Sequence, residues 1–168
     1  MAPTEDSALS LRGGASVTLS APADADAGAL AALLEAVADP REGLFERILA
    51  ALAGGEPGGA LVAREPGAAA LAAYAAWLVE ETGVRGELVC AVAPAFTGQG
   101  LGTLLLRRLE RDARAAGLRT LRVELHPDAR ALAAMLRDCG LHSFWDLEHP
   151  LAHVELVLGT RRSGWVTP

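Results

Sequence analysis

The sequence predicts a mixed α/β (α+β) fold, with one sheet of about seven strands flanked by about four helices. The first observation is length, because 168 residues suit a single domain with its own core. The second is composition: 51% of the residues are hydrophobic and 21% are charged, which is typical of a folded chain and not of a disordered one. The third is that segments with helical spacing of apolar residues alternate with short apolar runs bounded by Gly and Pro.

In the first half of the chain, a loose leader over residues 1–14 is expected before the first element. The predicted elements are a strand over 17–19, a helix capped by Asp24 or Asp26, a second amphipathic helix over 44–52, and strands over 60–64, about 69–80 and 86–93. Asp39-Pro40 is expected to end the first helix and Gly54-Gly55 the second. The Ala-rich segment 69–80 has helix propensity, but the turn signals EPG and ETGVRG on either side favour a strand.

The second half of the sequence predicts a helix, a strand, another helix and a terminal hairpin. Leu101, Leu105 and Leu109 recur every four residues, which indicates a helix from about Gly100 to Gly117. The remaining predicted elements are a strand over 118–125, a helix from about Asp128 to Asp138, and strands over about 142–147 and 153–158. A single domain is therefore expected over residues 15–159, followed by a C-terminal tail over 160–168.

Charge, hydropathy and cysteine usage exclude several classes of protein. A formal net charge of −6 disfavours a nucleic-acid binder. The acidic start MAPTEDSALS does not have the pattern of a signal peptide, and the longest apolar run, residues 68–79, is too short to span a membrane. Cys90 and Cys139 stand in apolar surroundings and the histidines lack metal-ligand spacing, so core cysteines and no metal site are expected. The chain is expected to be cytoplasmic, with no nucleic-acid or membrane partner.

Residues 97–102 (TGQGLG) form a glycine-rich loop between a predicted strand and a predicted helix. Gly98, Gly100 and Gly102 would let backbone N–H groups converge, and a helix N-terminus adds about half a positive charge. That combination can cradle a pyrophosphate, although many such turns serve only packing. No Gly-Lys-Ser/Thr follows, which excludes a P-loop, and the strand comes too late in the chain for a typical dinucleotide-binding unit.

The surroundings of the loop make the signal more specific. The stretch ELVCAVAPAFTGQGLGTLLLRRL, followed by RTLRVEL-HPD and a helix that ends in CGL, resembles the GNAT family of acyl-CoA N-acyltransferases, nearest to bacterial protein-lysine acetyltransferase domains. The resemblance is densest over 86–142, and it implies a mixed sheet splayed between its fourth and fifth strands and acetyl-CoA as the donor. It also implies that the backbone of Cys90, Ala91 and Val92 pairs with the pantetheine arm. The residues that would wrap the pyrophosphate are Thr97, Gly98, Gln99, Gly100, Leu101, Gly102 and Thr103.

Two departures from the family pattern bear on activity. Thr97 stands where the family usually has Arg or Gln, so one charge-assisted contact with phosphate is lost. Leu136 stands where a Tyr often occurs, which removes the usual general acid. The leaving thiol resembles that of Cys, with a pKa of about 8.5, and can therefore depart largely as a thiolate without that acid.

Two carboxylates are candidate general bases for the acceptor amine. Glu87 opens the strand before the loop, where lysine-acetylating relatives often carry their glutamate. Glu124 lies on the strand 118–125, on which Arg122, Glu124 and His126 share one face. Either carboxylate can instead be an ordinary surface residue, and water alone could deprotonate the amine. We favour Glu87.

The leading hypothesis is an acetyl-CoA-dependent N-acetyltransferase that modifies a primary amine, with a protein lysine as the expected acceptor. The alternative acceptor is a small-molecule amine. A hypothesis from another class is a non-catalytic acyl-CoA-binding regulatory module, which Thr97 and Leu136 suggest.

Overall fold

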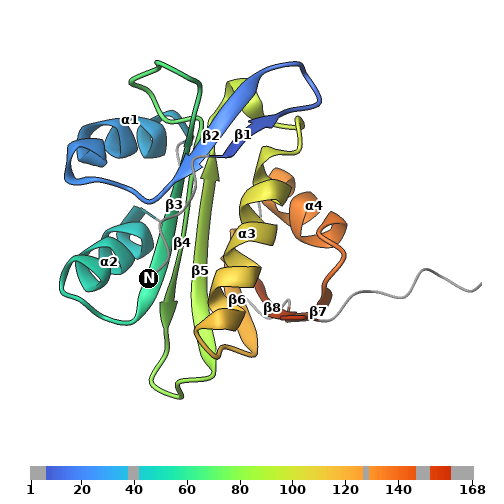
Figure 1. The fold of residues 1–168 in the computed structure, drawn as a ribbon. Helices are drawn as coiled ribbons and strands as arrows, with labels where there is room; N and C mark the ends of the chain where they lie inside the picture. Colours follow the sequence, from blue (N-terminus) through green and yellow to red (C-terminus); the bar gives the residue numbers. More distant parts are fainter. Residues whose placement is uncertain (1–6, 38–41, 127–128, 147–151, 160–168) are drawn as a thin grey trace, which may run out of the picture.

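The computed structural model describes residues 7–37, 42–126, 129–146 and 152–159 (Figure 1). These residues form one sheet of eight strands in the order β1-β2-β3-β4-β5-β6-β8-β7. The strands are β1 (Ser7–Ser10), β2 (Ser16–Ser20), β3 (Gly58–Arg64), β4 (Ala73–Val79), β5 (Arg85–Val92), β6 (Thr120–Leu125), β7 (His142–Asp146) and β8 (Ala152–Val157). Neighbouring strands are antiparallel, except that β5 and β6 are parallel.

Helices cover both faces of the sheet. They are α1 (Ala27–Val37), α2 (Glu42–Ala53), α3 (Leu101–Ala115) and α4 (Arg130–Asp138), with the short 3-10 turns η1 (Asp24–Asp26) and η2 (Pro94–Phe96). α1 and α2 lie on one face, and α3 and α4 lie on the other (Figure 1). No helix of the described residues is both long and apolar enough to cross a membrane.

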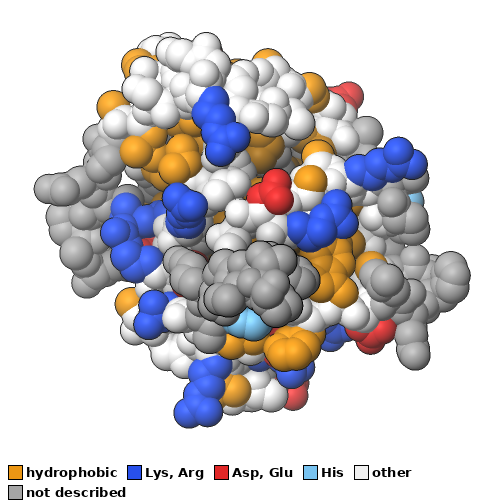
Figure 2. All heavy atoms as spheres, turned by 90° about the vertical axis from the view of Figure 1, so that its right-hand side faces the viewer, with side chains coloured by type: hydrophobic (Ala, Val, Ile, Leu, Met, Phe, Trp, Pro, Cys, Tyr) orange, Lys and Arg blue, Asp and Glu red, His pale blue; other side chains and the backbone are white. Residues whose placement is uncertain are grey.

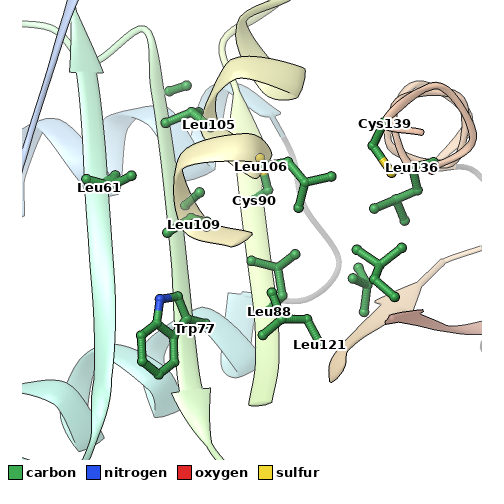
Figure 3. Close-up of a cluster of buried hydrophobic side chains, with 14 of the residues drawn as sticks. Leu61, Trp77, Leu88, Cys90, Leu105, Leu106, Leu109, Leu121, Leu136 and Cys139 are labelled. Atoms are coloured by element: carbon green, nitrogen blue, oxygen red, sulfur yellow. Dashed lines mark hydrogen bonds between the residues drawn. The ribbon is translucent and has the colours of Figure 1, made fainter. Parts of the chain in front are cut away.

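Each face of the sheet buries its own hydrophobic core. Phe45 of α2 packs with Val89 of β5 in the core under α1 and α2. Leu109 of α3 packs with Leu88 and Cys90 of β5 in the other core (Figure 3). Successive residues of β5 therefore alternate between the two faces, which fixes the face on which each candidate site residue lies.

The ladder between β5 and β6 is short. Its register runs from Arg85↔Thr120 to Leu88↔Val123 and stops there. β5 continues to Val92 and remains paired with β4 on its other side, from Val79↔Gly86 to Ala73↔Val92. The central strands β5 and β6 therefore separate toward their C-terminal ends. The family resemblance implies a sheet that is splayed in this way.

The predicted fold class is confirmed, with eight strands where about seven were expected. The predicted helices and strands all occur, and most of their bounds agree within a few residues. The Ala-rich segment 69–80 is a strand as predicted, but β4 begins only at Ala73. Asp39-Pro40 and the predicted tail 160–168 lie outside the described residues.

The expected loose leader is wrong for residues 7–14. Ser7–Ser10 form β1, which pairs with β2 from Ser7↔Leu19 to Ser10↔Ser16. The Leu11 N–H donates to the carbonyl of Ala15 at 2.8 Å and closes the turn, in which Gly14 has a φ of +85°. Leu11 is only 5% exposed, because it reaches the core on the α3 side. Burial of this apolar side chain and pairing with β2 order a segment whose polar composition indicated a loop.

Candidate active site

Backbone groups of β5 line the gap between β5 and β6. The Ala93 N–H donates to the carbonyl of Ala72 at 2.9 Å, toward β4. Because strand backbone groups alternate in direction, those of Ala91 also point toward β4, and those of Cys90 and Val92 point toward the gap. Of the three residues expected to pair with pantetheine, Cys90 and Val92 thus present polar backbone groups to the open side.

The glycine-rich loop follows β5 directly and ends at the start of α3. Gly98 and Gly100 have φ values of +77° and +90°, a left-handed region that favours glycine. Gly100 is the N-cap of α3, and its carbonyl accepts the N–H of Leu104 at 3.1 Å. Helix geometry leaves the N–H groups of the first residues, Leu101, Gly102 and Thr103, without acceptors inside the helix. The loop therefore presents converging N–H groups that suit an anion.

The side chains of the loop hold its shape. Thr97 Oγ1 donates to the carbonyl of Ala93 at 3.4 Å, and Gln99 Nε2 donates to the carbonyl of Ala95 at 2.8 Å. Both polar side chains are therefore turned back onto the chain before the loop. No residue from 88 to 106 carries a charge, so the loop itself supplies no cation.

Gly102 has a packing role that the sequence did not indicate. A Cβ at this position would collide with Sδ of Met135 on α4 and would lie 3.5 Å from Cγ2 of Val92. Glycine therefore lets α3 approach both α4 and β5 closely. Leu101 is also among the residues expected to wrap the pyrophosphate. Its side chain is buried in the core, so only its backbone can face a ligand.

Glu87 and Glu124 lie on the same face of the sheet, the one covered by α1 and α2. Glu87 is paired in register with Arg122 on β6, and side chains paired in this way point to the same side. Glu124 follows two residues later on that face and is paired with His153 of β8. The structure therefore brings the two candidate bases onto adjacent strands, at the point where these strands separate.

Glu87 forms an ion pair with Arg47 of α2 through Oε2. The side chain of Glu87 is 20% exposed and that of Arg47 is 55% exposed. Sequence reasoning did not find Arg47, because the two residues are 40 positions apart and nothing in the periodicity of α2 marks this arginine.

The same face is open over the strands beyond Glu87. A pocket of about 250 Å³ lies there, lined by Arg85, Arg122, Phe144, Trp145, Asp146, His153 and Glu155. Phe144 is 68% exposed, and Arg85 lies 3.5 Å from Glu155, measured from Nε to Oε1. This pocket is shallow and mixed in charge. Figure 2 shows the side of the molecule that carries α4 and β7, where arginine side chains lie beside hydrophobic patches.

No tyrosine lies at the position of the usual general acid. Leu136 of α4 is fully buried in the core on the α3 side (Figure 3). The one tyrosine of the chain, Tyr74, is buried on the opposite face against Phe45, with 6.2 Å between ring centroids. Burial raises the pKa of Tyr74, so its hydroxyl stays protonated. A tyrosine acid is therefore absent from the gap.

The cysteines are buried core residues, as expected. Cys90 is 7% exposed and Cys139 is 4% exposed, and neither forms a disulfide. Within the described part of the chain, no group of three His, Cys, Asp or Glu side chains could hold a metal ion.

Comparison with known proteins identifies the same architecture. The model of the acetyltransferase (GNAT) family matches residues 28–141. Among solved structures, the chain is similar to the GNAT domain of PAT from S. lividans (18% identity, 94% of this chain and 100% of that chain, TM-score 0.75). It is also similar to yncA of Salmonella typhimurium, solved with its cofactor acetyl-CoA (19%, 90% and 99%, 0.66). A third similar structure is the ribosomal-protein-alanine N-acetyltransferase of Brucella melitensis (21%, 83% and 99%, 0.64). No curated protein matches the chain.

Proposed function

We infer the function from one premise: this chain belongs to the acetyltransferase (GNAT) family. It is an N-acetyltransferase, and its donor is acetyl-CoA. We propose that the acceptor is the ε-amino group of a lysine on another protein. One observation carries this proposal: Glu87 and Glu124 lie on adjacent strands, on one face of the sheet, beside the point where β5 and β6 separate.

Glu87 and Val92, both on β5, have different roles in the proposed reaction. Glu87 accepts a proton from the acceptor ammonium, since an unperturbed lysine pKa of about 10.4 leaves little neutral amine at pH 7. The amine nitrogen then attacks the thioester carbon. The Val92 N–H, which points toward the gap, donates to the carbonyl oxygen as negative charge develops on it. A C–N bond forms, the C–S bond breaks and CoA leaves as a thiolate, while the second proton that the attacking nitrogen loses goes to water.

The shape of the open face supports a protein acceptor. The pocket over β5–β8, about 250 Å³, is below the range of roughly 300–1,000 Å³ that encloses typical small ligands. The exposed ring of Phe144 and the carboxylates of Asp146 and Glu155 can contact a cationic surface that inserts one side chain. A small amine would find few walls around it here.

The test is a thiol-release assay with acetyl-CoA and three kinds of acceptor: acyl-CoA synthetases, N-terminal peptides, and free amines. Because the chain contains no lysine, any acetyl-lysine found by mass spectrometry comes from the acceptor. We expect turnover and acetyl-lysine with a protein acceptor. Turnover with free amines alone would show a small-molecule enzyme. Tight binding of acetyl-CoA without thiol release from any acceptor would show a non-catalytic module.

A further inference from the structure

The tip of the β1–β2 hairpin lies directly against the glycine-rich loop. The backbone N–H of Arg12 donates to the carbonyl of Gln99 at 3.3 Å. At Gly13 an added Cβ would lie 2.9 Å from Cδ of Gln99, so the glycine lets the hairpin approach the loop closely. Leu11, buried in the core, anchors the tip on its other side. The hairpin and the loop therefore form one joined surface at the same end of the molecule (Figure 1).

This contact places the side chain of Arg12 over the start of α3. The Arg12 Nε lies 3.9 Å from the position that a Cβ would take at Gly100. Apart from the neighbours of Gly100 in the chain, no other heavy atom of the described residues lies within 4 Å of that position. Gly100 is the N-cap residue that precedes the unpaired N–H groups of α3. A positive side chain therefore stands beside the group of N–H donors that suits an anion.

Arg12 has no acidic neighbour along either of the two segments that meet here. It is the only charged residue from 7 to 20, and residues 88 to 106 contain none. The described residues also show no ion pair of Arg12 within 4.0 Å. Its side chain is exposed. Among the described residues, the guanidinium therefore has no carboxylate to displace before it binds an anion from solvent.

We propose that Arg12 binds the pyrophosphate of acetyl-CoA and replaces the cation that the loop lacks at Thr97. The inference rests on the donor assigned under the proposed function. A pyrophosphate carries two negative charges, which the loop's N–H groups and the helix terminus match only in part. An arginine fork adds charge-assisted hydrogen bonds to phosphate oxygens. The hairpin is thus a binding element for the donor, and its residues lie nearly ninety positions before the loop.

The test measures donor binding by calorimetry in the full chain, with CoA and dephospho-CoA as the ligands. We expect Arg12→Gln to weaken both about ten-fold, because both contain the pyrophosphate. Arg12→Lys should recover part of the loss. The slope of affinity against salt concentration should be smaller in Arg12→Gln than in the wild type. Pantetheine, followed by NMR titration, has no phosphate and should bind both proteins equally.

Arg119→Gln is the matched control, because it removes one exposed arginine beyond the far end of α3. Equal CoA affinity in Arg12→Gln and Arg119→Gln would overturn the proposal, and so would a loss for CoA but not for dephospho-CoA. A wild-type protein that binds no CoA would overturn the assigned donor and this inference with it.

Discussion

Glu87 on β5 and Arg47 on α2 form an ion pair that joins the sheet to a helix 40 residues earlier in the chain. The pair lies on the face where the acceptor is proposed to bind. Arg47 therefore fixes one carboxylate oxygen of the favoured base, Oε2.

We expect Glu87→Gln to lower kcat by about 10²–10⁴-fold, because the amide keeps the shape but cannot accept the proton. CoA affinity should hardly change, since the loop and the hairpin are the elements proposed to bind CoA. Raising the pH should partly rescue the variant, because more acceptor amine is then neutral without help. Thiol release against pH measures both effects.

Glu124→Gln is the matched control for that change and should be nearly neutral. If Glu124→Gln is the inactive variant and Glu87→Gln is active, Glu124 is the general base and Glu87 is not. Wild-type turnover in both single variants and in the double variant would exclude a carboxylate base and leave water in that role.

Gly100→Val should weaken CoA at least ten-fold, which corresponds to about 1.4 kcal/mol. The φ of +90° at Gly100 strains any β-branched residue, and the change distorts the N–H groups at the start of α3. Gly117→Val is the control, because Gly117 has a similar φ of +93° at the other end of α3. Calorimetry on the folded variants should show normal CoA affinity for the control. Normal affinity in both would remove the loop from the binding site.

Leu136→Tyr should not install a general acid. Leu136 is fully buried, so the larger ring overpacks the core and lowers the free energy of unfolding by about 1–3 kcal/mol. Leu136→Ala should lower it by about 2–5 kcal/mol through the cavity that it leaves. Urea denaturation measures both changes. A stable tyrosine variant with a raised kcat would contradict the placement of this side chain.

Asp26→Asn should destabilise the fold at neutral pH by about 1 kcal/mol, because its charge-assisted hydrogen bond with Arg64 becomes weaker. The carboxylate accepts the N–H of Ala23 at 2.8 Å and an N–H of Arg64 at 2.7 Å, and both contacts lower the pKa of Asp26. Because the folded pKa lies below the unfolded one, the stabilisation is complete above the unfolded pKa. It is lost as the pH falls through the folded pKa.

Denaturation of wild type and Asp26→Asn at several pH values should therefore show the difference vanish in acid. The control Asp24→Asn changes an exposed carboxylate in the same turn and should have little effect. A difference that persists at the lowest pH would show that the charge of Asp26 is not its cause.

Incubation with acetyl-CoA should give at most one modification of the protein itself, at the α-amino group. The chain has no lysine, and its two cysteines are buried. Intact mass and peptide mapping measure this. Acetylation of Cys90 or Cys139 in the native protein would show that the core opens to the donor.

The sequence predicted the fold and the position of the glycine-rich loop between β5 and α3 well, because both depend on local patterns. The four-residue spacing of Leu101, Leu105 and Leu109 specifies the buried face of α3, and the glycines mark its start. The contacts between distant segments could not be predicted in this way. The Arg47–Glu87 pair and the contact of Arg12 with Gln99 depend on tertiary packing, which no local period encodes.

The eight-stranded sheet has two parts, β1–β5 and β6–β8. They are joined directly by a ladder of only four residue pairs between β5 and β6. A donor bound between these two parts would present polar groups to the backbone edge of β5. It would take the place of the strand residues that β6 does not provide there. With the donor bound as proposed, the substrate would complete the sheet, and each turnover would remove and restore that part of it.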